Sequence, residues 1–152
     1  MLELQQRCTE CSVSGLVVPN FSIAAILMMR FAEQASLYFP DVEIIESHHD
    51  QKVDAPSGTA LRTEQRIQRI YKDKGRGIDD SLLSDADAKP IAIHSVRLPG
   101  LFAHQAVVFH GCGETLTIKH DAMSRDSMMP GVLMACRRVG ALHGLQIGLD
   151  HL

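Results

Sequence analysis

The stretch QAVVFHGCGETLTIKH (residues 105–120) holds two short apolar runs separated by two glycines. Residues 105–110 and 115–120 partly alternate between apolar and polar side chains, which is typical of a strand with one buried face. Gly111 and Gly113 suit a turn between two such strands. The stretch therefore predicts an antiparallel pair of strands, on which the remaining elements are expected to pack.

The same patterns predict the other elements of the chain. Short apolar or β-branched runs predict strands at 15–18, 41–47 and 91–97. Helical spacing predicts helices at 2–10, 21–39, 57–72 and 130–142, the second capped by Ser22 and stopped by Pro40. The polar residues 73–89 predict a loop. The expected fold class is α+β, with an open, mixed but mostly antiparallel sheet of about four strands and helices on one face.

Composition excludes several classes of function. The chain has 152 residues and a net charge of −3, whereas a nucleic-acid-binding face usually carries a basic excess. It contains no apolar run of the roughly 18 residues that span a bilayer, and no apolar signal-type segment at its start. We therefore expect a cytoplasmic protein with neither nucleic acid nor membrane as partner. Cys8 and Cys11 form a CxxC pair without a second pair, so reduced thiols are expected.

A second stretch, HHDQKVDAPSGTA (residues 48–60), predicts a binding site. Ser57, Gly58 and Thr59 open the helix after Pro56, and the first N–H groups of a helix attract anions. His48, His49 and Lys52 lie at or just past the end of the preceding strand. A histidine can exchange a proton near neutral pH, and a lysine supplies a positive charge or a second proton. A small ligand with two carboxylates would use all of these groups.

Simpler explanations exist for each of these features. A helix that opens with SGT is often only capped by its serine, and paired histidines are often surface residues. The four histidines on strand-like runs, at 94, 104, 110 and 120, match no familiar ligand spacing, so no metal site is predicted. Arg97 and Arg125 are interpreted as members of surface ion pairs without a role in the site. The close grouping of residues 48–60 nevertheless favours a site there.

EIIESHHDQKVDAPSGTA strongly resembles the signature of the 4-hydroxy-tetrahydrodipicolinate (dihydrodipicolinate) reductases of bacterial lysine and diaminopimelate synthesis. The resemblance extends to VVPNFSIA, SVRLPGLFAHQAVVF, GETLTIKHDAMSR and MPGVLMACRRV, and so covers nearly the whole chain. It implies transfer of a hydride from NADH or NADPH to a cyclic imine or enamine, with a proton supplied nearby. It also implies a homotetramer in which four sheets pack together.

The resemblance also implies roles for single residues. His48 is similar to the proton donor and acceptor of the family, and Lys52 to its second proton donor. His49, Ser57, Gly58 and Thr59 resemble the residues that hold the substrate carboxylates. Pro19, Asn20 and Phe21 resemble part of the contact with the nicotinamide.

The sequence departs from the family in three places. Nothing before Val17 resembles the glycine-rich turn GxGxxG that cradles a pyrophosphate. Ala24 stands where the family usually has glycine, and Ala106 where related sequences often have glutamate. We therefore expect residues 1–18 to be the end of a nucleotide-binding domain, 19–125 a substrate-binding and oligomerisation domain, and 126–152 a terminal helix that packs on the nucleotide domain.

Two functions remain open at this point. In the first, the chain binds a cyclic dicarboxylate and, by itself, reduces nothing. In the second, it is the substrate half of an active reductase, and a separate chain supplies the nucleotide-binding domain. NADH or NADPH is the cofactor implied in the second case, and binding by this chain alone is not expected.

Overall fold

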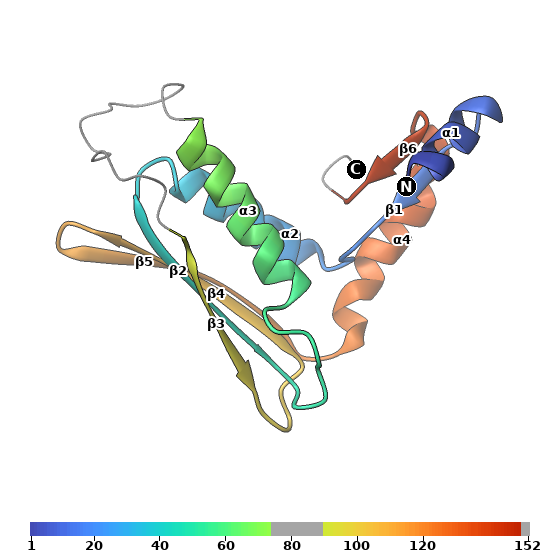
Figure 1. Cartoon of the computed structure of the whole chain (residues 1–152). Helices are drawn as coiled ribbons and strands as arrows, with labels where there is room; N and C mark the ends of the chain where they lie inside the picture. Colours follow the sequence, from blue (N-terminus) through green and yellow to red (C-terminus); the bar gives the residue numbers. More distant parts are fainter. Residues whose placement is uncertain (74–89, 150–152) are drawn as a thin grey trace. The chain divides into compact units, whose positions relative to one another are not determined.

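The structure is a computed structural model that describes residues 1–73 and 90–149 (Figure 1). It separates into two compact units: the first joins Met1–Ile26 to Arg125–Leu152, and the second is Leu27–Ser124. The loop predicted at 73–89 lies outside the described residues except for Asp73, which caps the helix before it. No helix in the described part of the chain has the length and apolar character needed to cross a bilayer.

The second unit is built on a four-stranded sheet with the strand order β3-β2-β4-β5. Its strands are β2 (Asp41–His48), β3 (Ala92–Arg97), β4 (Ala103–Gly111) and β5 (Glu114–Ala122). β4 pairs antiparallel with β2 and β5, and β3 pairs parallel with β2. The predicted mixed, mostly antiparallel sheet is therefore confirmed, as is the hairpin whose turn holds Gly113 at a φ of 77°.

Helices cover one face of this sheet (Figure 1). α3 (Gly58–Lys72) crosses between the parallel strands β2 and β3 and packs beside the part of α2 (Ile23–Ala35) that belongs to this unit. A buried hydrogen bond of 2.8 Å from Gln105 Nε2 to Thr63 Oγ1 ties α3 to the sheet. An ion pair of 2.7 Å between Arg66 and Glu33 ties α3 to α2. The core between the layers includes Met29, Ile44, Ile67, Val107 and Phe109.

α2 is shorter than the predicted helix at 21–39. Its start is correct, because the Ser22 hydroxyl accepts a hydrogen bond from the Ala25 N–H at 3.2 Å. The helix ends at Ala35, where the Ser36 hydroxyl donates to the Glu33 carbonyl and competes with the regular backbone pattern. Phe39, no longer helical, places its ring 5.9 Å from that of Phe109. Phe39 belongs to the turn before β2, so the helix predicted at 21–39 was too long at its C-terminal end.

The uncovered face of the sheet mixes charged and apolar side chains. Strand alternation places Glu43 and Ile45 on the side opposite the helices, and Ile45 is 41% exposed. His94 Nε2 lies 2.9 Å from a Glu43 carboxylate oxygen, and His104 Nδ1 lies 2.7 Å from Asp121. The apolar side chains of this face therefore lie beside two exposed histidine–carboxylate pairs.

The first unit is formed from both ends of the chain. It contains α1 (Leu2–Glu10), β1 (Gly15–Val17), the short 3-10 helices η2 (Arg125–Met128) and η3 (Val139–Ala141), α4 (Met129–Arg138) and β6 (Leu145–Ile147). β1 and β6 form a parallel two-stranded sheet. The sequence did not predict β6, whose three residues carry too little pattern. The α-helix predicted at 130–142 ends at Arg138 and is followed by the 3-10 helix η3, where Gly140 disfavours an α-helix.

Candidate functional site

The site predicted from the sequence lies in the second unit, where β2 ends and α3 begins. His48 is the last residue of β2, as predicted, and its side chain is 14% exposed. Its Nδ1 lies 2.6 Å from Oε2 of Glu46, which stands two residues earlier on the same face of the strand. The strand therefore presents a histidine at its end and an acid directly behind it.

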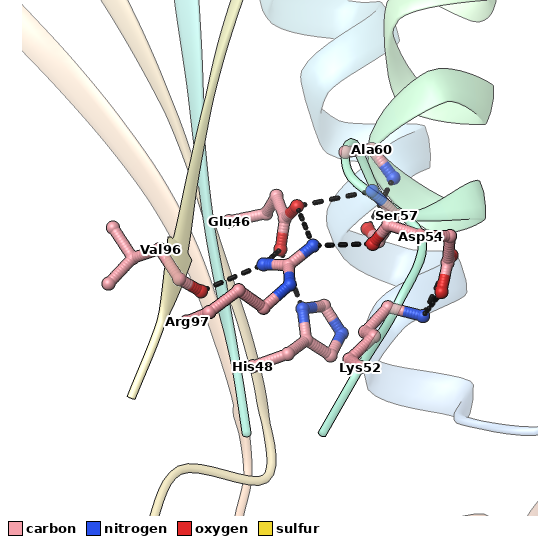
Figure 2. A network of polar contacts seen from close by, with 8 residues as sticks. All are labelled: Glu46, His48, Lys52, Asp54, Ser57, Ala60, Val96 and Arg97. Carbon is pink, nitrogen blue, oxygen red and sulfur yellow. Dashed lines mark hydrogen bonds and ion pairs between the residues drawn. The ribbon is translucent and has the colours of Figure 1, made fainter. Parts of the chain in front are cut away.

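Glu46 is fully buried and connects several segments of the site (Figure 2). Arg97, at the end of β3, forms a two-pronged ion pair with it, Nη2 at 2.7 Å from Oε1 and Nη1 at 2.8 Å from Oε2. The Ser57 N–H donates to Oε1 at 3.1 Å. One carboxylate thus holds the end of two strands and the start of α3.

The loop between β2 and α3 carries Lys52. Its Nζ lies 2.7 and 2.8 Å from the two carboxylate oxygens of Asp54. The backbone carbonyl of Asp54 accepts a hydrogen bond from Arg97 Nη2 at 2.7 Å, so the same arginine holds the loop and Glu46. A ligand carboxylate that approaches Lys52 must share the ammonium group with Asp54.

The start of α3 offers backbone donors to an anion. Ser57 caps the helix, because its hydroxyl accepts from the Ala60 N–H at 3.2 Å while its own N–H is bound to Glu46. The donors proposed for a ligand therefore come mainly from Gly58 and Thr59, and the Ser57 hydroxyl retains its own proton to donate. A Cβ added at Gly58 would meet nothing within 4 Å. The backbone at Gly58 is thus open to close approach.

The remaining residues of the predicted site are placed as follows. His49 is half-buried and begins the turn, with its carbonyl bound to the Lys52 N–H at 3.1 Å. Pro19, Asn20 and Phe21 belong to the first unit, where the Asn20 side chain accepts from the Ser22 N–H at 2.8 Å. The structure therefore brings together His48, His49, Lys52 and the Ser57–Thr59 turn, and it places the three nicotinamide-side residues in the other unit.

The electrostatics of the site centre on Glu46 and His48. Burial raises the pKa of Glu46, but hydrogen bonds from Arg97, Ser95, His48 and the Ser57 backbone outweigh it and lower the pKa to about 2. Burial lowers the pKa of His48 below its usual 6.5, and the charges of Lys52 and Arg97 act in the same direction, against Glu46. Glu46 is therefore ionised, and the His48 ring is mostly neutral at neutral pH.

Glu46 and Arg97 were missed by the sequence interpretation. Arg97 was interpreted as part of a surface ion pair, which is wrong because its partner carboxylate is fully buried. A signal for Glu46 was present in DVEIIES, where the glutamate occupies the same inward face as Ile44. An acid on the buried face of a strand requires a partner, and a basic residue at the end of a neighbouring strand is the natural candidate.

In the part of the chain that the structure describes, the other histidines and the cysteines do not gather into a metal site. Among residues 1–73 and 90–149, no cluster of three or more histidine, cysteine or acidic side chains could hold a metal ion. The cysteines are free thiols, with Cys8 buried and Cys11, Cys112 and Cys136 exposed.

Comparison with known proteins gives a consistent result. Residues 24–152 match the family model described as dihydrodipicolinate reductase, C-terminus. The chain is 49% identical to a 4-hydroxy-tetrahydrodipicolinate reductase of Coxiella burnetii, over 98% of this chain and 62% of the relative. It is 50% identical to one of Desulfitobacterium hafniense, over 98% of this chain and 58% of the relative. The chain thus spans about three fifths of the length of these relatives.

A solved structure supports the same assignment. The dipicolinate-bound dihydrodipicolinate reductase from Paenisporosarcina sp. TG-14 is similar to this chain with a TM-score of 0.78 and 45% identity. The similarity covers 97% of this chain and 59% of that structure. The fold, the matched family model and these relatives together show that the chain belongs to the dihydrodipicolinate reductase family and corresponds to its C-terminal part.

Proposed function

We propose that this chain binds a small cyclic dicarboxylate between the end of β2 and the start of α3. One observation carries the proposal: His48, Lys52 and the N-terminus of α3 are all held by the network around the buried Glu46. Lys52 and His49 supply cationic or donor groups on one side of the ligand. Gly58 and Thr59, with the Ser57 hydroxyl, supply donors on the other side.

The chemistry of the site suits a ligand that gains a proton. A protonated His48 donates from the ring nitrogen that faces away from Glu46, and solvent can restore the proton near neutral pH. Lys52 adds a second positive charge beside the ligand. A planar ring with a nitrogen between two carboxylates would offer an acceptor to the histidine and one anionic group to each side of the site. The dipicolinate bound to the Paenisporosarcina relative has this chemistry.

Thermal unfolding with pyridine-2,6-dicarboxylate tests this proposal. A ligand present at about 100 times its dissociation constant should stabilise the fold by roughly 2.7 kcal/mol. Benzene-1,3-dicarboxylate, which keeps both carboxylates but lacks the ring nitrogen, provides the matched control and should stabilise less. An unchanged melting curve at millimolar pyridine-2,6-dicarboxylate would contradict the binding function.

A second function, reduction of the bound ligand, is favoured by the names of the relatives. For the 152-residue chain alone we expect no oxidation of NADH or NADPH with the cyclic imine substrate. The resemblance gives Pro19, Asn20 and Phe21 as candidates for contact with the nicotinamide, and they would touch one end of the dinucleotide. Lost positioning can cost about 7–11 kcal/mol, whereas general acid catalysis supplies about 10²- to 10⁴-fold.

A nucleotide titration and a stopped assay distinguish the two functions. Micromolar nucleotide binding, or turnover that disappears in His48→Ala, would show that this chain is a reductase by itself. Turnover that appears only after a separately produced glycine-rich nucleotide-binding domain is added would support the substrate-half function.

The homotetramer implied by the family resemblance remains a prediction. The sheet is covered by helices on one face only, and its other face carries Ile45 and Val108 between charged pairs. Light scattering at micromolar concentration should report four times the monomer mass of 16.7 kDa. A monomer mass would contradict the prediction.

A further inference from the structure

The carboxylate of Glu46 uses both of its oxygens within the site. Oε1 accepts from Arg97 Nη2 at 2.7 Å and from the Ser57 N–H at 3.1 Å. Oε2 lies 2.8 Å from Arg97 Nη1 and 2.6 Å from His48 Nδ1. Each oxygen therefore has one contact with the arginine and one with a segment that carries proposed ligand-binding groups (Figure 2).

This arrangement determines which ring nitrogen of His48 bears a proton. An ionised carboxylate only accepts hydrogen bonds, so the nitrogen beside it must carry the hydrogen. In the neutral ring the proton therefore sits on Nδ1 and the lone pair on Nε2. When the ring takes up a second proton, that proton is on Nε2, away from Glu46, where a ligand can receive it.

Arg97 makes the arrangement rigid. Besides Glu46, its guanidinium donates to the carbonyls of Val96 at 2.8 Å and Asp54 at 2.7 Å. The arginine side chain is 18% exposed, and the glutamate side chain is fully buried. A buried ion pair is not in itself a strong source of stability. This one instead fixes the position of the histidine, the lysine-bearing loop and the helix start relative to one another.

We infer that Glu46 is a positioning residue, which holds the proton of neutral His48 on Nδ1, keeps Nε2 toward the ligand and anchors the start of α3 through Ser57. The inference deepens the proposed function, because it assigns how the proton-donating group of that site is oriented. It concerns the ligand-free protein, so it can be tested without any ligand.

The first test is the protonation pattern of the wild-type ring. The chain with ¹⁵N-labelled histidine is examined by long-range ¹H–¹⁵N NMR at pH 8, where the lowered pKa of His48 leaves the ring neutral. His48→Gln identifies its signals among those of the eight histidines. We expect a protonated Nδ1 and an unprotonated Nε2. A ring protonated on Nε2, or an even mixture of the two forms, would overturn the inference.

The second test is Glu46→Gln, which keeps the shape of the side chain. Its amide NH₂ in place of Oε1 would oppose two donors, Ser57 N–H and Arg97. In place of Oε2 it opposes Arg97 and His48, and the histidine can adapt by moving its proton, while the Ser95 hydroxyl, which also bonds to Glu46, can rotate to suit either orientation. We therefore expect His48 to switch to the form protonated on Nε2. A variant that folds and keeps the proton on Nδ1 would show that Glu46 does not set the tautomer.

Asp121→Asn is the matched control, because Asp121 contacts His104 Nδ1 at 2.7 Å on the opposite face of the sheet. It should leave the His48 signals unchanged, and a switch of His48 in this variant would overturn the inference. If Glu46→Gln does not fold, the wild-type pattern still decides the question.

Ligand binding separates this inference from the function on which it rests. With pyridine-2,6-dicarboxylate at pH 6, Glu46→Gln should bind about 10-fold more weakly, because a neighbouring carboxylate that favours the imidazolium form has been removed. The charged groups that act on His48 are Glu46, Lys52 and Arg97, and only the first changes in this variant. A wild-type chain with the predicted tautomer but without ligand binding would contradict the function and support the positioning role. Equal affinity of the two proteins would contradict the positioning role.

Discussion

Two histidine–carboxylate pairs lie on opposite faces of the same sheet, and a lysine–carboxylate pair accompanies each of them. In one, His48 Nδ1 lies 2.6 Å from Glu46, and Lys52 pairs with Asp54 at 2.7 Å. In the other, His104 Nδ1 lies 2.7 Å from Asp121, and Lys119 pairs with Asp121 at 2.9 Å. The distances are nearly the same. The Glu46 side chain, however, is 0% exposed, whereas that of Asp121 is 38% exposed.

The difference shows that the histidine–acid distance alone does not identify a site. Asp121 has its pKa lowered by Lys119 and His104, its two neighbours at the surface. Glu46 is bound by two strands and a helix N-terminus, and its pKa falls to about 2 despite burial. Exposed pairs contribute little because water screens them, whereas a buried carboxylate must be satisfied by the surrounding chain. Four predictions test this contrast, from the largest expected effect to the smallest.

Replacing Glu46 and replacing Asp121 by alanine should lower the free energy of unfolding by very different amounts. Glu46→Ala leaves Arg97 without its partner and creates a cavity beside His48, so we expect the free energy of unfolding to fall by about 4 kcal/mol. Asp121→Ala removes only exposed pairs and should change it by no more than about 0.5 kcal/mol. Urea unfolding at pH 7 measures both. Similar losses in the two variants would contradict the contrast.

Lowering the pH should reduce the contribution of the buried Glu46 carboxylate to the stability of the fold within a defined pH range. The pKa of Glu46 lies at about 2 in the fold, below its ordinary 4.5. Its contribution to stability is therefore fully present above pH 4.5 and is lost as the pH falls toward 2. The difference in unfolding free energy between the wild type and Glu46→Gln should shrink by roughly 3 kcal/mol over this range. A difference that does not depend on pH would show that the fold does not lower the pKa of Glu46.

The two lysines should differ in ligand binding. Lys52→Ala removes a charged donor from the proposed site and should weaken pyridine-2,6-dicarboxylate binding by roughly 1.5–3 kcal/mol. Lys119→Ala removes a lysine paired in the same way on the other face and should leave the affinity unchanged. Calorimetric titration of the two variants measures this. Equal weakening would indicate a general effect of net charge.

The smallest effect is expected from a single methyl group at the start of α3. Gly58→Ala meets no atom within 4 Å, so the fold should be kept, with a gain of up to about 1 kcal/mol from helix propensity. The methyl group would stand where the ligand approaches the backbone, and affinity should fall about 10-fold. Gly140→Ala, which also meets no atom within 4 Å, is the control and should not alter binding. Unchanged affinity in Gly58→Ala would show that the ligand does not approach this turn.

Most of the fold follows from local sequence patterns. The strand pair at 105–120, the cap at Ser57 and the short strand before His48 each carry their own signal, and each is present in the structure. The elements that were missed depend on distant partners. β6 is a strand only because β1 lies beside it, and the end of α2 is set in part by the packing of Phe39 on Phe109.

The candidate site likewise has one part that the local sequence predicts and another that depends on distant partners. The grouping of His48, Lys52 and Ser57–Thr59 could be read from thirteen consecutive residues, because one loop and the ends of the strand and helix that it joins carry them all. The pairing of Glu46 with Arg97 could not, because it requires the parallel register that sets His48 opposite Arg97. A parallel neighbour reached through a helix leaves no mark on the local pattern of either strand.

The pairing of β1 with β6 also has a consequence for the order of folding. Gly15 and Leu145 are partners in that sheet, although almost the whole chain separates them. β1 is synthesised before residues 27–124 and β6 after them, so β1 has no partner in this sheet until β6 has been made, whereas residues 27–124 can complete their own sheet before then. Contacts this distant in sequence form slowly, because the closure of a long loop has to precede them. The β1–β6 sheet is therefore expected to assemble after the four-stranded sheet.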